Sequence, residues 1–115
     1  MAQGNKDDPL NLTLTEESIL NALLFRERYG LEIMDAIAKA SKGKKTIGFS
    51  SLYPTLRKLE KKGFVTSRWG DETPEEHTGA RRRYYQISGS GMAAVKQKQE
   101  YLSALQQLTP VLGEV

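Results

Sequence analysis

Few side chains in this sequence have the types and spacing that a catalytic centre needs. The chain has no cysteine and a single histidine, His77, which stands beside Glu75 and Glu76. A tetrahedral metal site needs further nitrogen or sulfur ligands, and the sequence offers none to complete one around His77. It has no glycine-rich phosphate loop, and its serines lie in positions typical of helix caps. The sequence therefore predicts a protein that is not an enzyme and that needs no metal or other cofactor.

A different chemistry is indicated by the basic side chains, which are concentrated in the middle of the chain. Residues 41–83 hold 11 basic and 5 acidic side chains, a net charge of +6. Residues 1–40 hold 4 basic and 7 acidic side chains, and residues 84–115 hold 2 of each. The net charge of the whole chain is only +3. A local surplus of this size is typical of a surface that binds a polyanion.

Two helices are predicted in the first third of the chain. The first begins at Thr13 or Thr15, because either can cap a helix with acidic residues in its first turn, and it continues until Gly30 ends or bends it. The second covers residues 30–41, where apolar residues recur at helical spacing and a glycine and lysines then stop the pattern. We expect both helices to pack through their apolar sides.

A third helix is predicted over residues 50–62. Ser50 or Ser51 supplies its N-cap, and Pro54 lies in the first turn, where its missing N–H is harmless. Residues 46–49, just before it, could pair as one short extended edge.

A β-hairpin follows the third helix. Residues 64–69 and 81–87 are rich in β-branched and aromatic side chains, and the polar residues 70–80 between them contain the glycine and proline of an open loop. We interpret His77 as a solvated residue at the tip of this loop.

The last predicted element is a long helix over residues 88–109, capped by Ser88 or Ser90. Its apolar side chains recur at spacings that keep them on one side of the helix. This stripe extends too far to be covered by a small domain, so we expect a second copy of the chain to cover it. The predicted dimerisation residues are Met92, Val95, Leu102, Leu105 and Leu108.

The order of helix, helix, helix and hairpin is that of a winged helix-turn-helix. The predicted fold is mainly α with a small β hairpin (α+β), extended by one long C-terminal dimerisation helix. Residues 1–11 are expected to be a disordered arm, residues 12–87 the winged domain, residues 88–109 the dimerisation helix, and residues 110–115 a flexible tail.

The third helix of such a fold lies in the major groove of DNA, and the hairpin, or wing, rests on neighbouring phosphates. If Leu52, Leu56 and Leu59 form the core seam, the opposite side of the helix carries small hydroxyl groups and cations that can approach an anion. The predicted DNA-binding residues are Lys44, Lys45, Ser50, Ser51, Tyr53, Pro54, Thr55, Arg57, Lys58, Lys61, Arg81, Arg82 and Arg83.

Several of these features have a simpler interpretation. A solvated helix also carries a charged outer face, but residues 81–83 are three consecutive arginines, and alternation in a strand sends them to both faces. Trp69 could stack on a ligand, although packing against the base of the wing is the more common role. Of Tyr84 and Tyr85, one is expected in the core while the other faces outward and could reach a phosphate.

Three segments together resemble a known family. In order and spacing, the sequence resembles the PadR family of bacterial transcriptional regulators over residues 12–108, through "YGLEIMDAI", "SSLYPTLRKLEKKGFVTSRWG" and "GARRRYYQISGSG". The resemblance implies a dimeric winged-helix repressor whose C-terminal helix makes the dimer, and which is often released from its operator by a small aromatic molecule. The single C-terminal helix resembles the short-tailed branch of the family.

The same resemblance places particular residues. Ser51, Tyr53 and Pro54 match the start of the family's recognition helix, and Arg82 and Arg83 match its basic wing strand. Family members that bind aromatic drugs commonly offer a tryptophan at the dimer centre, whereas Tyr101 is the only aromatic residue of this C-terminal helix.

The sequence thus predicts a homodimeric regulator that binds double-stranded DNA at an inverted repeat. Its apolar runs are far shorter than the ~20 residues that span a bilayer, and its first ten residues lack the apolar core of a signal peptide, so a soluble, cytoplasmic protein with no membrane partner is expected. Two alternatives remain open: a winged-helix module that binds another protein, and an RNA-binding protein.

Overall fold

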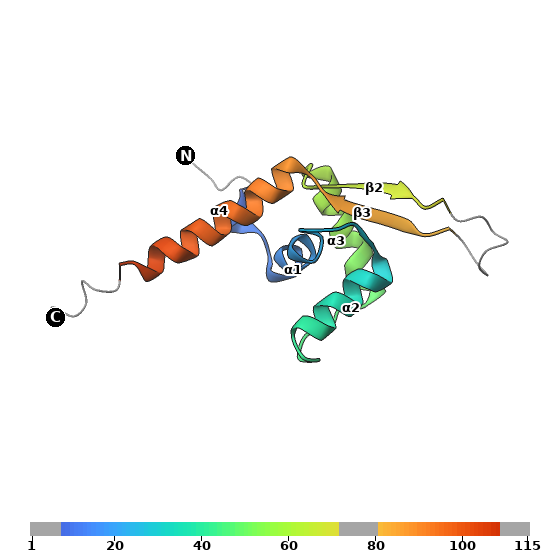
Figure 1. Cartoon of the computed structure of the whole chain (residues 1–115), viewed down its shortest axis with the longest axis horizontal. Coiled ribbons are helices and arrows are strands. Elements are labelled where there is room, and N and C mark those ends of the chain that lie inside the picture. Colours follow the sequence, from blue (N-terminus) through green and yellow to red (C-terminus); the bar gives the residue numbers. More distant parts are fainter. Residues whose placement is uncertain (1–7, 72–80, 109–115) are drawn as a thin grey trace.

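The computed structural model describes residues 8–71 and 81–108 of the chain. The described elements form the α+β winged helix-turn-helix that the sequence predicts, with the wing strands extending from the helical body on one side and the last helix extending on the other (Figure 1). In chain order they are η1 (Pro9–Asn11), α1 (Leu14–Ala22), β1 (Arg28–Tyr29), α2 (Gly30–Ala40), α3 (Phe49–Lys61), β2 (Val65–Trp69), β3 (Arg83–Ile87) and α4 (Gly89–Gln106).

The sheet has three antiparallel strands in the order β1-β3-β2, one more than the predicted hairpin. The hairpin itself is present, with Val65 opposite Ile87 and Trp69 opposite Arg83. The added strand β1 places Tyr29 opposite Tyr84 on the other side of β3. Two residues are too few to show the alternation by which a strand is recognised in a sequence, so the sequence does not predict this strand.

The first helix starts where predicted and ends earlier. Thr13 and Glu16 form a capping box: Thr13 Oγ1 accepts from the Glu16 N–H at 3.1 Å, and Glu16 Oε1 accepts from the Thr13 N–H at 2.8 Å. The predicted extension to Gly30 is wrong, because α1 ends at Ala22. The chain leaves the helix so that residues 28–29 can pair with β3, and the Arg28 Nε–H donates to the Ala22 carbonyl at 2.7 Å.

The third long helix, α3, begins one residue earlier than predicted. Its N-cap is Gly48, whose carbonyl accepts from the Leu52 N–H at 2.9 Å, so neither predicted serine is the cap. Pro54 is the sixth residue of the helix and lies beyond the first turn. Residues 46–48 form no strand, which corrects the expectation of an extended edge there.

The ends of the chain also differ from the prediction. Pro9–Asn11 form a turn of 3-10 helix inside the expected disordered arm, and Leu12 that follows is buried. The helix α2 ends one residue before its predicted end, and α4 ends at Gln106, three residues before its predicted end. Residues 1–7 and the predicted tail over residues 110–115 lie outside the described residues.

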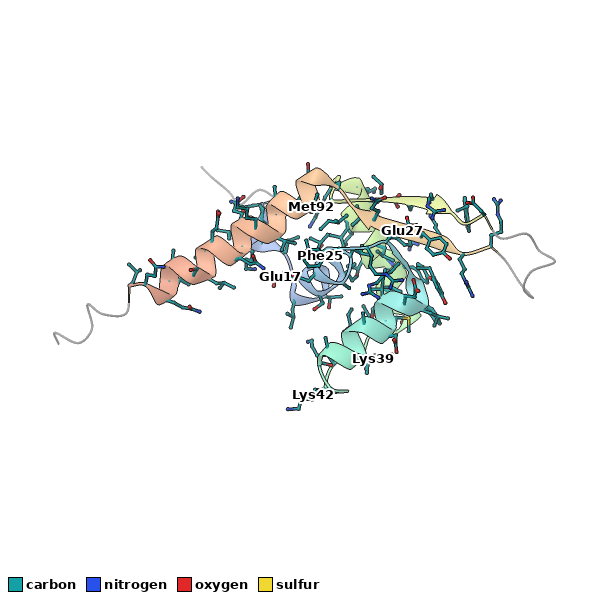
Figure 2. The ribbon with its side chains drawn as sticks, viewed as in Figure 1. Glu17, Phe25, Glu27, Lys39, Lys42 and Met92 are labelled. Atoms are coloured by element: carbon teal, nitrogen blue, oxygen red, sulfur yellow. The ribbon has the colours of Figure 1, made fainter. Side chains whose placement is uncertain are left out.

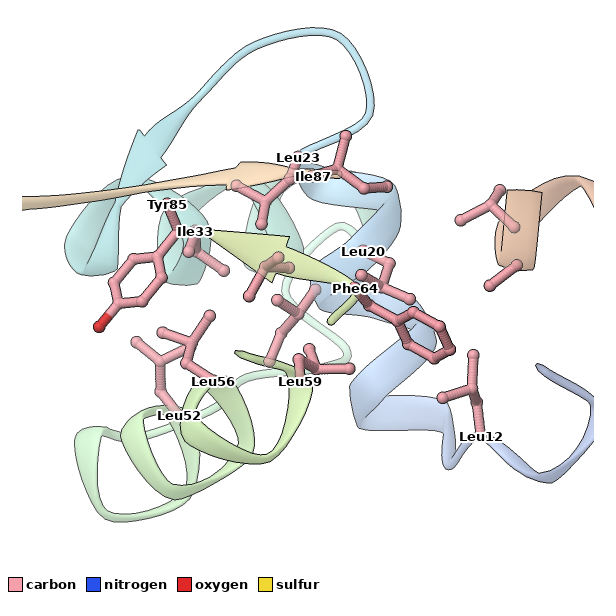
Figure 3. Packing of buried hydrophobic residues seen from close by; sticks show 14 residues of the cluster. Leu12, Leu20, Leu23, Ile33, Leu52, Leu56, Leu59, Phe64, Tyr85 and Ile87 are labelled. Atoms are coloured by element: carbon pink, nitrogen blue, oxygen red, sulfur yellow. The ribbon is translucent and has the colours of Figure 1, made fainter. Parts of the chain in front are cut away.

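A single apolar core joins the helices to the sheet (Figure 3). The predicted seam of α3 is confirmed, because Leu52, Leu56 and Leu59 each have 0% exposure. The core consists of Leu12, Ile19, Leu20, Leu23, Ile33, Leu52, Leu56, Leu59, Phe64, Val65, Tyr85, Ile87, Ala94 and Val95. Within residues 8–71 and 81–108, no helix combines the length and apolar character that crossing a bilayer requires.

The helix α4 is fixed to the base of the wing by a close approach of two backbones. Ser88 caps it by accepting from the Gly91 N–H at 3.0 Å, and the Ser88 hydroxyl donates to the Gly63 carbonyl at 2.6 Å. A β-carbon at Gly91 would overlap the Phe64 carbonyl oxygen and the Ile87 side chain. One turn of α4 therefore lies directly on the backbone that leads into β2.

This approach predicts opposite effects of the same substitution at two glycines of α4. Gly91→Ala should lower the free energy of unfolding by about 1–3 kcal/mol, because a backbone carbonyl cannot move aside as a side chain can. Gly89→Ala meets no atom within 4 Å, so it should leave stability unchanged or raise it by up to ~1 kcal/mol through helix propensity. Urea denaturation measures both, and equal effects of the two substitutions would contradict the proposed close approach.

Candidate nucleic-acid interface

The outer face of α3 is exposed, as the sequence predicts. The exposed residues on it are Ser50, Ser51, Pro54, Arg57, Lys58 and Lys61. No carboxylate of residues 8–71 or 81–108 forms an ion pair with Arg57, Lys58 or Lys61. Three cationic groups on this helix are therefore open to an external anion.

Two predicted residues of α3 have internal contacts as well. Thr55 Oγ1 donates to the Ser51 carbonyl at 2.7 Å. Tyr53 is half-buried against the core, its ring is stacked on that of Phe49 at 5.8 Å between centroids, and its hydroxyl reaches the backbone of Gly30. Tyr53 therefore joins α3 to the start of α2, a role that its prediction as a DNA-binding residue did not include.

The fourth cation near the end of α3 belongs to the fold. The Lys62 ammonium group lies 3.0 Å from Glu16 Oε2 on α1, and the side chains of both are largely buried. Burial raises the pKa of Glu16, but the hydrogen bond from the Thr13 N–H and the Lys62 charge outweigh burial, and the pKa lies below its ordinary value. This ion pair ties α3 to α1 and separates Lys62 from the exposed cations of α3.

The lysines before α3 are exposed in the connection from α2. Lys42 and Gly43 have φ values of 56° and 81°, which turn the chain out of the helix at the end that Lys42 marks in Figure 2. Ser41 Oγ then accepts from the Lys45 N–H at 2.8 Å. Lys44 and Lys45 thus sit on a fixed turn at the far end of α2, with their side chains exposed.

The three wing arginines have different surroundings. Arg81 and Arg82 are exposed, and the Arg82 guanidinium lies over the Tyr29 ring at 4.6 Å. Arg83 is half-buried, with Nη2 donating to Ser67 Oγ at 2.8 Å and lying 4.0 Å from Glu60 Oε2. Alternation along the strand therefore gives Arg83 a structural contact with α3, as expected for one member of three consecutive arginines.

The aromatic residues of the wing also divide between the core and the surface. Tyr85 is buried, whereas Tyr84 is half-buried and packs edge-on against Tyr29 at 5.6 Å. Trp69 is 50% exposed, which contradicts the expectation that it packs into the base of the wing, and Arg83 lies 5.0 Å from its ring centroid.

A hollow between the wing and the starts of α2 and α3 was not predicted. Its volume is about 500 Å³. Its lining residues are Tyr29, Gly30, Leu31, Phe49, Tyr53, Trp69, Arg81, Arg82, Arg83 and Tyr85. The sequence places these residues in four separate segments. The pairing of β1 and β2 with β3 and the contact of Tyr53 with Gly30 bring them together.

The side chains that could suggest a metal site are those around the single histidine. His77, Glu75 and Glu76 lie outside the described residues, and no cluster of potential metal ligands occurs in residues 8–71 and 81–108.

The predicted dimerisation stripe is exposed on α4, with one exception. Met92, Leu102 and Leu105 are about half exposed, Leu108 is 64% exposed, and all of residues 101–108 are exposed where α4 projects from the body (Figure 1). Val95 is different, because it is 7% exposed and belongs to the core of its own chain. Lys98, which interrupts the stripe, forms an ion pair with Glu17 of α1.

A wing, a basic recognition helix and a projecting C-terminal helix define the class of winged helix-turn-helix transcriptional regulators. Within that class, the chain belongs to the transcriptional regulator PadR-like family, whose model matches residues 19–97.

The chain is also similar to individual proteins and solved structures. An uncharacterised protein of Lysinibacillus sphaericus is 33% identical over 75 residues, which are 65% of this chain and 65% of that protein's own length. A transcriptional regulator from Clostridium thermocellum is 31% identical and has a TM-score of 0.67 over 81% of this chain and 86% of that chain. Bacillus subtilis PadR, solved in complex with operator DNA, is 24% identical, with a TM-score of 0.61 over 77% of this chain and 46% of that chain.

The ion pair between Glu16 and Lys62 predicts a pH-dependent contribution to stability. Because the pKa of Glu16 is lowered in the folded state, its contribution is present above the ordinary value of about 4.5 and is lost as the pH falls through the folded value. Glu16→Gln should therefore lower the free energy of unfolding at pH 7 by roughly 1–2 kcal/mol. The difference from the parent chain should shrink below pH 4.5.

Asp35→Asn is the matched control, because it removes the exposed ion pair with Lys39 on α2. It should cost less than about 0.5 kcal/mol at pH 7. Denaturation curves at pH 7 and pH 3.5 supply both comparisons. A Glu16→Gln deficit that persists at the lower pH would show that the carboxylate charge is not its cause.

Proposed function

We propose that the chain is a sequence-specific regulator that binds double-stranded DNA as a homodimer and represses transcription from an inverted-repeat operator. The observation that carries the proposal is the outer face of α3, where Arg57, Lys58 and Lys61 are exposed and have no ion pair with the described carboxylates. The operator complex of Bacillus subtilis PadR, a protein of the same fold, supports the same mode of binding.

The surroundings of the cations indicate how base reading and phosphate binding are divided. Ser51 and Lys58 lie on the exposed side of α3, which in this fold enters the major groove, so we assign base contacts to them. Arg81 and Arg82 extend from the wing, which rests on the DNA backbone in this fold, so we assign phosphate contacts to them. Arg83 donates to Ser67 Oγ on β2, and the Ser67 hydroxyl donates to Glu60 Oε2 on α3 at 2.6 Å. These contacts fix the wing strands to α3, next to Arg81 and Arg82.

A homodimer is supported by the apolar side of α4. Leu102, Leu105 and Leu108 leave an apolar stripe without a cover within the described chain, and a stripe of this kind is usually buried by a partner. A second copy related by a two-fold axis would place two recognition helices about one turn of DNA apart, ~34 Å. Selection of bound fragments from genomic DNA of the source organism should therefore recover an inverted repeat.

The salt dependence of binding tests the assignment of the wing. The binding is measured with a duplex obtained by that selection. Arg81→Ala and Arg82→Ala should each flatten the slope of log affinity against log salt, by about 0.9 for each phosphate contact that is lost. Both variants should weaken specific and random duplexes by similar factors, because phosphates carry no sequence information.

Lys96→Ala serves as the control, because it removes an exposed cation from α4, away from the wing and from α3. Its salt slope should equal that of the parent chain. Unchanged slopes in both wing variants would remove the wing from the interface. Binding that does not depend on salt at all would favour a protein-interaction module, and preference for duplex RNA in competition would favour an RNA-binding protein.

The assembly is tested on the projecting part of α4. Leu105→Glu places like charges against each other across a two-fold axis, so the dimer should dissociate to monomers at micromolar concentration, with loss of affinity for the selected duplex. Analytical ultracentrifugation measures the mass, and Gln97→Glu adds the same charge at an exposed polar position of α4 as the control. A parent chain that sediments as a monomer, or a Leu105→Glu dimer with full affinity, would contradict the proposal.

A further inference from the structure

The hollow between the wing, α2 and α3 has a chemistry that binding to duplex DNA does not use. Three of its large apolar residues are about half exposed: Leu31 at 54%, Phe49 at 51% and Trp69 at 50%. Phosphates of a duplex can contact the arginines of the hollow, but the faces of paired bases are stacked inside the double helix and cannot stack on its rings. The aromatic wall therefore has no stacking partner in an intact duplex.

The wall is organised before any ligand binds. Gly30 has no β-carbon, so the Tyr53 ring can lie against the backbone at the start of α2, where any larger residue would overlap it. Phe49, the first residue of α3, is stacked on Tyr53 with an angle of 11° between the rings. The two parallel rings and Trp69 offer flat surfaces on which a planar group can stack.

The charged side chains that line the hollow are all cationic. Arg81, Arg82 and Arg83 line it, and no described carboxylate does. Arg83 is held by Ser67, and Arg82 lies over the Tyr29 ring, so both guanidinium groups are positioned by the fold. Planar guanidinium groups bind phosphate through paired hydrogen bonds, which favours a phosphorylated ligand.

From these features we propose that the hollow binds a free nucleotide, with the base against Phe49 and Trp69 and the phosphate at the arginines, and that a bound nucleotide weakens the affinity for duplex DNA. A ligand of this hollow needs both a flat ring and an anionic group. The volume of the hollow, about 500 Å³, is within the range of small-molecule sites and larger than a single-ring acid would fill. The second part of the inference rests on the proposed function, because it assumes that Arg81 and Arg82 also contact DNA.

Three related probes separate the two halves of the ligand. AMP carries both base and phosphate, adenosine lacks the phosphate, and ribose 5-phosphate lacks the base. Trp69 is the only tryptophan of the chain, so its indole N–H and the Gly30 amide report directly on the hollow in nuclear magnetic resonance spectra. AMP should shift both signals with saturation and bind at least about 10-fold more tightly than either fragment. No shift, or equal affinities for all three, would overturn the site.

Variants locate the binding. Phe49→Ala should weaken AMP binding about 5-fold or more through loss of stacking, and Arg81→Ala should weaken AMP binding while leaving that of adenosine unchanged. Both side chains are exposed, and thermal denaturation confirms that each variant folds. Phe25→Ala is the matched aromatic control, since Phe25 is 93% exposed and does not line the hollow, and its AMP affinity should equal that of the parent chain. Full AMP affinity in Phe49→Ala would overturn the assignment of the base.

Competition with DNA tests the regulatory part in the chain without substitutions. Fluorescence polarisation of a labelled selected duplex should report weaker binding with AMP at saturation and unchanged binding with adenosine at the same concentration. Unchanged DNA affinity with the hollow occupied would overturn this part. A chain that binds no DNA would contradict the proposed function, while the AMP shifts of the DNA-free protein would still decide the site. Tighter binding of a duplex with one unpaired adenine, abolished in Phe49→Ala, would assign the rings to DNA instead.

Discussion

The structure depends on the burial of one side of α3. Leu52, Leu56 and Leu59 have no exposed surface, and they pack with residues of α1, α2 and the sheet in a single core. Because a helix has fixed geometry, burying this seam also determines which residues face outward and at what angle. The exposure of Arg57, Lys58 and Lys61 is thus a consequence of apolar packing on the opposite side. Packing of the core therefore sets the direction in which these three cations point.

Ion pairs separate the cations that hold the fold together from those that stay exposed. Lys62, Arg83 and Lys98 are held by Glu60 or by the acids of α1, and they join elements that are far apart in the sequence. Arg68 pairs with Glu27, and this contact, with the Arg68 charge, lowers the pKa of the Glu27 carboxyl. The acids that neutralise these cations lie mainly before α2, in the part of the chain whose net charge is negative. Within residues 8–71 and 81–108, Arg57, Lys58 and Lys61 on α3 and Lys44 and Lys45 before it form no ion pair.

The order of elements, the seam of α3 and the exposed basic face could be predicted from the sequence, because each produces a periodic pattern within one segment. The errors fall where contacts between distant segments decide the structure. The early end of α1 and the existence of β1 depend on pairing of Tyr29 with Tyr84, and the half-buried place of Tyr53 depends on the missing side chain of Gly30. Val95 shares the periodicity of the exposed stripe on α4, yet it is buried because the first half of the helix lies on the body of the chain. Periodicity identifies the side of a helix, and it does not show where along the helix its cover ends.

The junction at Gly91 carries a geometric consequence for an assembly held by α4. Because the first turn of α4 is seated on the Phe64 carbonyl and the Ser88 hydroxyl reaches the Gly63 carbonyl, the direction of this helix is coupled to the end of α3 without a flexible linker. In a two-fold pair, the angle at which the two α4 helices cross would then set the distance between the outer faces of the two α3 helices. Because α4 is 18 residues long, a small change in the crossing angle at its far end would produce a larger change in that distance. Relatives with the same reading helix could in this way acquire different spacings between half-sites through changes made only at the far end of α4.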